Sequence, residues 1–250
     1  MNEIWNIWPK DVHYGDVLFK RAIGEYPEME SSKALAKLLK KRIKPRDRVL
    51  DVGCGAGHYL TSLKREIPTP FSYTGVDSTQ NYIDLAKKAF EGQADVEFIQ
   101  SDIFNLSMGD ASFDIVTCNN VLLHLPSIQK PVAELLRVTR STLVIRTLIG
   151  NRSFRIKDVE VSGDEFYPEG EPRQYHYYNI YSQAYFKHLL AGHPKVRGYE
   201  FIEDWDYDPA VIEQAGAEHE GMMDTTDVLG KWQRNGYILQ PWTFLVVEVS

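Results

Sequence analysis

Residues 49–57 read Val-Leu-Asp-Val-Gly-Cys-Gly-Ala-Gly, and this stretch decides the fold. The residues from Arg48 to Val52 form a short apolar run that is typical of a buried strand. The three glycines predict a tight turn, and the pattern from His58 to Glu66 predicts a helix that stops before Pro68. A strand that runs through a glycine-rich turn into a helix is the first unit of a parallel α/β sheet.

The same alternation continues on both sides of this unit. Ser31-Ser32 is expected to cap a helix from Lys33 to Ile43, and Ser78 or Thr79 to cap another from Asn81 to Phe90. Further strands are predicted at residues 71–76, 96–100, 113–118, 141–148, 196–202 and 242–249, and further helices at 127–139 and 180–191. Strands that alternate with helices indicate an α/β class fold with a parallel sheet covered on both faces.

The alternation breaks after Gly150. Residues 151–178 are rich in Tyr, Phe, Glu, Asp and Arg without a clear period, and a polar, glycine-containing segment precedes the last strand. We find no internal repeat and no second domain. The expected organisation is a single domain over residues 1–250, with an N-terminal helical cover over 1–44, an inserted cap after the fifth strand over 151–195, and a second elaboration over 206–236.

Composition excludes several classes of protein. Apolar residues make up 43% and charged residues 25% of the chain, which are ordinary globular values and not those of a disordered, collagenous or coiled-coil protein. The formal net charge of −7 argues against nucleic acid or an anionic membrane as the main partner. Cys54 and Cys118 indicate neither a disulfide framework nor a metal site, and we expect both to be reduced and buried. The first residues lack a signal-peptide pattern, so the expectation is a soluble, cytoplasmic protein.

Three acidic residues accompany the glycine turn. Asp51 lies two residues before the first glycine, where a carboxylate suits an ammonium group better than a pyrophosphate. The third glycine of a dinucleotide-binding turn would fall at position 58, which is His58. Asp77 follows the second strand and can accept both hydroxyls of a ribose, and Asp102 follows the third and can accept from the exocyclic amine of adenine. The pattern therefore describes a ligand with an amino-acid end, a ribose and an adenine.

These residues closely resemble the motifs of class I S-adenosylmethionine-dependent methyltransferases. The four matching stretches, in order, are residues 49–57, Gly75-Val76-Asp77, Gln100-Ser101-Asp102-Ile103, and Phe113 to Pro126. The resemblance covers about residues 45–150 and the closing strands, and it does not cover 151–178 or 206–236. It implies a Rossmann-like methyltransferase fold, that is, a doubly wound, mostly parallel seven-stranded sheet.

The resemblance also implies roles for individual residues toward S-adenosylmethionine, with S-adenosylhomocysteine as the product. The implied contacts are Gly53 and Gly55 along the methionine moiety, Asp51 at its ammonium group, Asp77 and Ser78 at the ribose, Asp102 and the Ile103 backbone N–H at the adenine, Asn119 through its carbonyl, and Tyr14 as a cover over the cofactor. For Asp77 and Asp102, a helix cap or a solvated strand end is the competing interpretation.

Candidate catalytic residues lie farther along the chain. His124 follows the fourth strand, whose end should border the transferred methyl group, and partial burial would keep its imidazole neutral and able to accept a proton. His176 is a second candidate base in an aromatic cluster where Arg173, Tyr175 and Tyr177 are candidates for substrate binding. A structural His124 and a packed surface cluster are the alternatives to these roles.

The expected function is methyl transfer to a small-molecule acceptor, with O-methylation slightly favoured because two histidines are candidate bases. A protein that binds S-adenosylmethionine without catalysis is the first alternative, and a nicotinamide-dependent oxidoreductase is the second. The expected protein is a monomer or a homodimer that binds neither nucleic acid nor a membrane, with residues 151–178 as a mobile cover over the acceptor pocket.

Overall fold

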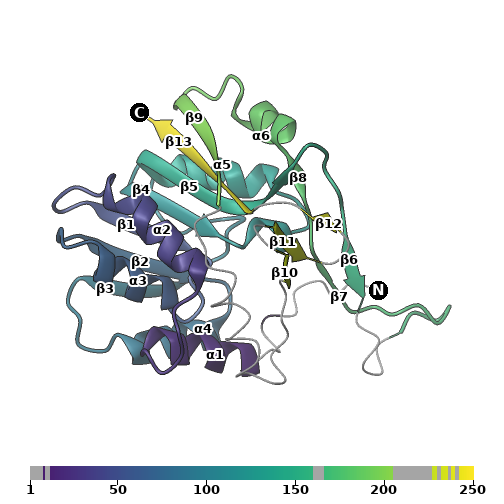
Figure 1. Ribbon diagram of the computed structural model, residues 1–250, viewed down its shortest axis with the longest axis horizontal. Helices are drawn as coiled ribbons and strands as arrows, with labels where there is room; N and C mark the ends of the chain where they lie inside the picture. The colour runs from purple at the N-terminus through teal and green to yellow at the C-terminus, as the bar shows by residue number, and fades with distance from the viewer. Residues whose placement is uncertain are drawn as a thin grey trace.

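The described residues are Trp8, 12–159, 166–204, 227–229, 232–235, 238–239 and 242–250 of a computed structural model. They build a central sheet with helices on both faces (Figure 1). Its strands are β1 (Arg48–Val52), β2 (Ser72–Asp77), β3 (Val96–Gln100), β4 (Phe113–Asn119), β5 (Thr139–Gly150), β8 (Tyr181–Ser182), β9 (Val196–Glu203) and β13 (Trp242–Val249).

The strand order is β3-β2-β1-β4-β5-β13-β9, and β8 pairs with the end of β5 beside this path. Strands β3, β2, β1, β4 and β5 are parallel to one another, whereas β13 is antiparallel to both β5 and β9. The prediction of a doubly wound, mostly parallel sheet with seven strands along its path is therefore confirmed, and β8 adds an eighth.

The helices are α1 (Val12–Ala22), α2 (Glu30–Lys40), α3 (His58–Glu66), α4 (Gln80–Ala89), α5 (Gln129–Val138) and α6 (Gln183–Leu190). Neighbouring strand residues such as Val49 and Leu50 belong to two different apolar clusters, because successive side chains of a strand point to opposite faces. One cluster includes residues of α2, α3 and α4, and the other includes residues of α5 and α6. The sheet is thus buried on both faces, and α1 packs outside α3 and α4.

The N-terminus of α2 differs from the sequence prediction. The helix begins at Glu30 rather than Lys33, and Met29 occupies the cap position without a side-chain cap bond. Ser31 and Ser32 therefore do not cap the helix. The Ser32 hydroxyl donates to the Met29 carbonyl at 2.8 Å and lies 2.7 Å from the Ser62 hydroxyl of α3. The Ser32 hydroxyl is therefore hydrogen-bonded between the packed helices α2 and α3 and does not cap α2.

The segment after β5 also differs from the prediction. The helix predicted to begin at residue 180 begins at Gln183, because Tyr181 and Ser182 pair with the end of β5 as strand β8. Within residues 151–178, which show no period in the sequence, β6 (Lys157–Val159) and β7 (Tyr175–Tyr177) form an antiparallel pair. This pair lies far from α2 and α3, to the right in Figure 1.

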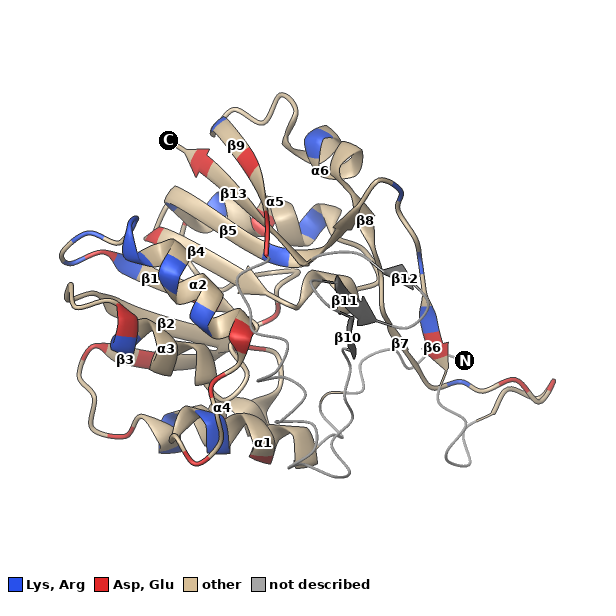
Figure 2. Cartoon of the chain, viewed as in Figure 1, with Lys and Arg blue, Asp and Glu red and all other residues tan. Residues whose placement is uncertain are grey.

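Most of the predicted elaboration at residues 206–236 lies outside the described residues. Its described parts are β10 (Asp227–Leu229) and β11 (Trp232–Asn235), which form a small antiparallel sheet with β12 (Ile238–Leu239). Acidic and basic residues are interspersed over the helices and connections, whereas the central strands are mostly uncharged (Figure 2). Within the described part of the chain, no helix combines the length and apolar character needed to cross a membrane.

Candidate active site

The candidate site lies where the strand order changes direction. Strand β1 pairs with β2 on one side and with β4 on the other, so the chain winds outward from β1 in both directions. The glycine turn follows β1, and residues 120–124 follow β4. In open α/β sheets, this position between the carboxyl ends of two strands is where ligands bind.

The three glycines of the turn have left-handed backbone conformations, with φ of 80° at Gly53, 55° at Gly55 and 81° at Gly57. A Cβ atom at Gly53 would lie 2.2 Å from Cγ2 of Val121, and one at Gly55 would lie 2.7 Å from Cδ1 of Leu18. Larger residues are therefore excluded by strain and by packing within the chain. The glycines allow α1 and the segment after β4 to approach the turn closely.

Asp77 connects the glycine turn to the end of β2. One carboxylate oxygen accepts the Gly55 N–H at 3.0 Å, and the other accepts the Thr79 N–H at 2.9 Å. Burial raises the pKa of Asp77, and these backbone hydrogen bonds oppose that shift. Each oxygen keeps a further lone pair, so the fixed carboxylate fits the two hydroxyls of a ribose. The neighbouring Ser78 is exposed, and its carbonyl accepts from Gln100 Nε2 at 2.9 Å.

Asp51 is buried within β1 and accepts a hydrogen bond from the Tyr73 hydroxyl at 2.7 Å. Burial is the largest influence on this carboxyl and raises its pKa to about 6. Asn119, at the end of β4, is also buried and donates from Nδ2 to the Thr117 hydroxyl. Its Oδ1 has no hydrogen-bond donor among the described residues. A carboxylate beside an unsatisfied amide oxygen fits a ligand ammonium group.

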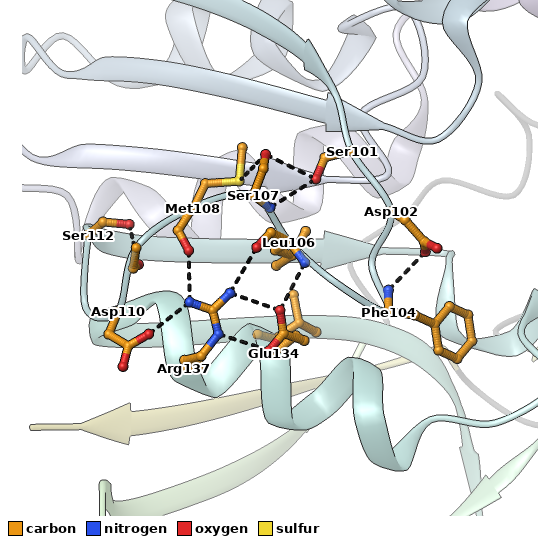
Figure 3. Close-up of polar contacts among 12 residues, drawn as sticks. Ser101, Asp102, Phe104, Leu106, Ser107, Met108, Asp110, Ser112, Glu134 and Arg137 are labelled. Atoms are coloured by element: carbon orange, nitrogen blue, oxygen red, sulfur yellow. Dashed lines mark hydrogen bonds and ion pairs between the residues drawn. The ribbon is translucent and has the colours of Figure 1, made fainter.

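Asp102 follows β3 and is exposed. Its Oδ1 accepts the Phe104 N–H at 2.9 Å, and its carbonyl accepts the Asn105 N–H at 2.9 Å, so the residue closes a tight turn (Figure 3). One carboxylate oxygen is thus used within the turn, and the second is left for a ligand. The side chain of Ile103 is buried in the apolar cluster of α5 and α6.

The half-buried Tyr14 of α1 packs with Leu18, Ala56 and Tyr82 beside the glycine turn. Its ring centroid lies 5.6 Å from that of Trp8, and Trp8 in turn lies 4.9 Å from the ring of His124. The N-terminal cover thus reaches from the turn after β1 to the residues after β4. Trp8 is a candidate site residue that the sequence did not indicate, because a lone tryptophan before a helix has no local signature.

His124 ends a short 3-10 helix, Leu122–His124. Its Nδ1 lies 2.9 Å from the backbone carbonyl of Tyr177. A carbonyl can only accept, so Nδ1 carries the proton of the neutral ring and Nε2 keeps its lone pair. Burial and the nearby His176 lower the pKa of His124 to about 4, although the Tyr177 carbonyl opposes this shift. The imidazole is therefore neutral near pH 7, and its Nε2 can accept a proton.

The structure brings the two candidate bases together. The His176 ring lies 6.4 Å from that of His124, and Tyr178 contacts both rings at 5.4 and 6.3 Å. Nε2 of His176 is 3.4 Å from Oδ2 of Asp158, its partner on β6. Tyr178 belongs to the aromatic cluster seen in the sequence, whereas Asp158 was not singled out.

The other residues of the aromatic cluster lie elsewhere. Tyr175 and Tyr177 are two positions apart on β7, so their side chains point to the face opposite His176. Their hydroxyls are 3.3 Å apart, and Nζ of Lys157 lies 4.2 Å from the Tyr175 ring centroid. The guanidinium of Arg173 lies over the ring of Tyr167 at 5.8 Å. The alternation of β7 therefore separates Tyr175 and Tyr177 from His176, and Arg173 precedes the strand.

Long-range hydrogen bonds hold the turn that carries His124. Asn179 is buried, and its Nδ2 donates to the Leu125 carbonyl at 2.9 Å while its backbone N–H donates to the Leu123 carbonyl at 2.9 Å. The Tyr181 hydroxyl donates to the Leu122 carbonyl at 3.1 Å. Residues that follow β7 thus fix the backbone on both sides of His124.

A second buried network joins the two halves of the sheet. Arg146 of β5 donates from Nε and Nη2 to Oδ2 of Asp204 at 2.9 and 2.7 Å, and from Nη1 to Oδ1 of Asn120 at 2.7 Å. Asn120 has a φ of 58° and donates from Nδ2 to the Tyr59 hydroxyl at 3.3 Å. The guanidinium lies 4.4 Å from the Trp242 ring centroid. This network supports the turn directly after Asn119.

Comparisons with known proteins agree with this geometry. A family model described as a methyltransferase domain matches residues 49–142. The demethylmenaquinone methyltransferase of Lactobacillus johnsonii is 32% identical over 142 residues, which are 52% of this chain and 57% of that protein. The ubiquinone biosynthesis O-methyltransferase of Coxiella burnetii is 31% identical over 121 residues, which are 47% and 50% of the two chains. The matches thus cover only about half the length of these relatives.

Two solved structures share the fold. The [4+2]-cyclase SpnF superposes with a TM-score of 0.58 at 20% identity, over 86% of this chain and 80% of that one. A methyltransferase from Methanosarcina mazei described as SAM-dependent gives a TM-score of 0.55 at 16% identity, over 84% and 96%. Residues 49–142 of this chain thus match the methyltransferase-domain family, and the chain is similar to S-adenosylmethionine-dependent methyltransferases.

Proposed function

We propose that the protein transfers a methyl group from S-adenosylmethionine to a small-molecule acceptor and releases S-adenosylhomocysteine. The observation that carries this proposal is the row of carboxylates on β1, at the end of β2 and after β3, beside a left-handed glycine turn where the strand order changes direction. The acids match the three polar parts of the cofactor in sequence along the sheet edge. Asp77 suits the ribose, Asp51 with Asn119 suits the ammonium group, and Asp102 with the Ile103 N–H suits the adenine.

The cofactor supplies an activated methyl group on a sulfonium, and the protein's task is to bind and align the acceptor. Alignment in a near-attack geometry accounts for roughly 7–11 kcal/mol of barrier reduction in such reactions. We propose that His124 accepts the acceptor's proton at Nε2, because its Nδ1 is engaged by the Tyr177 carbonyl. His176 is the second candidate base, at a ring separation of 6.4 Å.

A hydroxyl acceptor needs a base more than an amine does, which favours O-methylation. The names of relatives that act in ubiquinone biosynthesis and on demethylmenaquinone support a small acceptor. The aromatic surroundings of His124, formed by Trp8 and Tyr178, favour an acceptor with a ring. We further propose that the protein acts in the cytoplasm as a monomer or homodimer, and that neither nucleic acid nor a membrane is its partner.

Two alternatives predict different results. A binding protein without catalysis would keep the carboxylates, and the fold shared with a cyclase means that fold alone does not decide the reaction. A nicotinamide-dependent oxidoreductase is disfavoured, because His58 is buried at the position of the third glycine of a dinucleotide-binding turn.

Calorimetric titration with S-adenosylmethionine tests the cofactor. Asp77→Ala is expected to weaken binding by at least about tenfold, because two charge-assisted hydrogen bonds are lost. Asp84→Ala, on the exposed side of α4, is the matched control and should bind like the wild type. Unchanged affinity in a folded Asp77→Ala variant would contradict the proposed cofactor site.

The reaction itself is tested with a panel of ring hydroxyl, amine and carbon acceptors and detection of S-adenosylhomocysteine. Formation of this product with a hydroxyl acceptor supports O-methylation. Tight cofactor binding without product from any acceptor would favour the binding protein. Mass spectrometry that identified a nicotinamide nucleotide on the purified protein would favour the oxidoreductase.

A further inference from the structure

Two side chains of α5 hold the connection between β3 and β4 through the backbone of one residue, Leu106 (Figure 3). Oε2 of Glu134 accepts the Leu106 N–H at 2.9 Å, and Nη2 of Arg137 donates to the Leu106 carbonyl at 2.9 Å. Arg137 also donates from Nε and Nη2 to the two Glu134 oxygens, both at 2.8 Å. The pair thus presents an acceptor and a donor side by side, as a neighbouring strand does.

The remaining donors of Arg137 hold the same connection farther along. Nη1 donates to the Met108 carbonyl at 2.7 Å and to Oδ1 of Asp110 at 2.8 Å. With these bonds, all N–H groups of the guanidinium are used. The Asp110 side chain is 79% exposed and that of Glu134 only 15%, so solvent screens the contact with Asp110 far more. The bonds of Arg137 to Glu134 and to the Leu106 and Met108 carbonyls therefore hold the connection between β3 and β4 in place.

The hydrogen bonds continue from Leu106 to Asp102. The N–H of the next residue, Ser107, donates to the Ser101 hydroxyl at 3.3 Å, and the two serine hydroxyls are 3.4 Å apart. Inside the loop so closed, Asp102 accepts from Phe104 and Asn105. Residues 101–107 therefore form a loop that α5 fixes at one end and that carries the Asp102 carboxylate at the other (Figure 3).

We propose that Glu134 and Arg137 are positioning residues for recognition of the adenine base, acting through the loop of residues 101–107 on Asp102. This inference rests on the proposed function, in which Asp102 accepts from the exocyclic amine of adenine. Neither residue touches the base. Their effect is to hold the carboxylate and the Ile103 N–H at the spacing that an adenine edge requires.

The test compares binding of S-adenosylhomocysteine with binding of S-inosylhomocysteine, in which a carbonyl oxygen replaces the exocyclic amine. A carboxylate cannot accept from that oxygen, so the wild type should prefer the adenine ligand by about tenfold or more. Arg137→Lys keeps the charge but lacks the planar set of donors, and it should lower the preference to below about threefold. A change that only destabilised the fold would leave this ratio unaltered, because both ligands are titrated into one preparation.

Arg140→Lys is the matched control. Arg140 donates from Nε to the Ala111 carbonyl and from Nη1 to Oδ1 of Asp114, both at 3.0 Å, at the end of the connection nearer β4. This variant should keep the wild-type preference. Glu134→Gln should lower the preference as Arg137→Lys does, and it carries the test if the arginine variant does not fold.

The outcomes separate the inference from the proposed function. If Asp102→Ala removes the preference while Arg137→Lys and Glu134→Gln keep it, the inference is wrong and the cofactor site stands. If the wild type binds the two ligands equally or binds neither, the adenine placement fails, and the inference fails with it. An equal loss in Arg140→Lys would show a general loosening of the connection and would also overturn the inference.

Discussion

The edge of the sheet at β1, β2 and β3 and the segment of residues 151–182 both place polar side chains near the candidate site, but by different means. At the sheet edge, Asp77 accepts from Thr79 and Asp102 accepts from Phe104, each two residues along the chain, and Asp77 also accepts from Gly55 of the glycine turn, 22 residues away. In the later segment, Asn179 and Tyr181 bond to carbonyls 54 and 59 residues away. Local bonds follow from short sequence patterns, whereas distant bonds depend on how the finished fold brings segments together.

His124 stands at the border of these two regions. It follows β4 in the chain, but its ring is held by Tyr177, and the backbone on either side of it is held by Asn179 and Tyr181. The proposed cofactor residues therefore keep their positions without contacts from residues 151–182. The proposed base, His124, depends on such contacts for its position. Four experiments test this division, in order of expected effect.

The largest effect is expected for His124→Ala. Loss of a general base should reduce turnover by roughly 10²–10⁴-fold while the affinity for S-adenosylhomocysteine stays within about twofold. The pKa of His124 is lowered to about 4, so the base loses its lone pair only as the pH falls toward 4. In a pH–rate profile measured at saturating cofactor, the wild-type rate should therefore fall near pH 4. The variant should lack this acidic limb of the profile.

His188→Ala is the control for this experiment, because His188 is exposed on α6. If His176→Ala removes the acidic limb and His124→Ala leaves it in place, the two assignments are reversed. If both variants keep it, proximity or a different base drives the reaction.

The second effect concerns the link between the two regions. Arg146→Met leaves the buried carboxylate of Asp204 without its cation, and the free energy of unfolding should fall by about 3–5 kcal/mol. Urea denaturation measures this change. Arg197→Met, at an exposed position of β9, should change it by less than about 0.5 kcal/mol. A small effect at Arg146 would mean that the two halves of the sheet are stable without this network.

The third experiment removes one distant bond. Asn179→Ala leaves the Leu125 carbonyl without its donor and should cost about 1–3 kcal/mol of stability. Because the turn carrying His124 loosens, turnover should fall more than cofactor affinity does. Asn151→Ala is the control, since Asn151 is exposed. Equal losses in both measurements would place the cofactor under the influence of the later segment and contradict the division.

The smallest effect is a pH dependence confined to the sheet edge. The pKa of Asp51 is raised from its ordinary value to about 6, so this carboxyl binds a proton more tightly in the folded protein than in the unfolded chain. As the pH falls through 6, its protonation favours the folded state but removes the charge that attracts the ligand ammonium. Affinity for S-adenosylhomocysteine should therefore weaken by about fivefold between pH 6 and 5, as the ionised fraction of this single carboxyl falls.

Calorimetric titration across this range measures the slope, and Asp51→Asn serves as the control. The variant should bind weakly at every pH and lack the slope between pH 6 and 5. An identical slope in the variant would assign the pH dependence to another group.

Much of the fold could be predicted from the sequence, and the reasons are local. The bounds of β1 and α3 agree with the prediction because an apolar run, three glycines and a helical pattern follow one another without interruption. Strand β8 could not be predicted, since Tyr181-Ser182 continues the apolar pattern of the next helix and becomes a strand only beside Ile149. The role of Ser32 likewise depended on Ser62, which lies 30 residues away.

The candidate site divides in the same way. The positions of Asp51, Asp77 and Asp102 at one sheet edge follow from strand ends, whereas no pattern indicated Trp8 or the clamp formed by Glu134 and Arg137. The clamp acts on backbone groups of Leu106, whose own side chain has no part in it. Because every residue has the same backbone groups, the sequence at Leu106 does not indicate that these hydrogen bonds form.

The sequence by itself determined the parallel sheet, the glycine turn and the order of the three acids, because hydrophobic periodicity and strand ends act over a few residues. Only the tertiary structure decided which nitrogen of His124 keeps its lone pair, since that depends on a carbonyl 53 residues away. It also separated His176 from Tyr175 and Tyr177 on the two faces of β7. Burial likewise raised the pKa of Asp51 and lowered that of His124, because desolvation disfavours the charged form of each group.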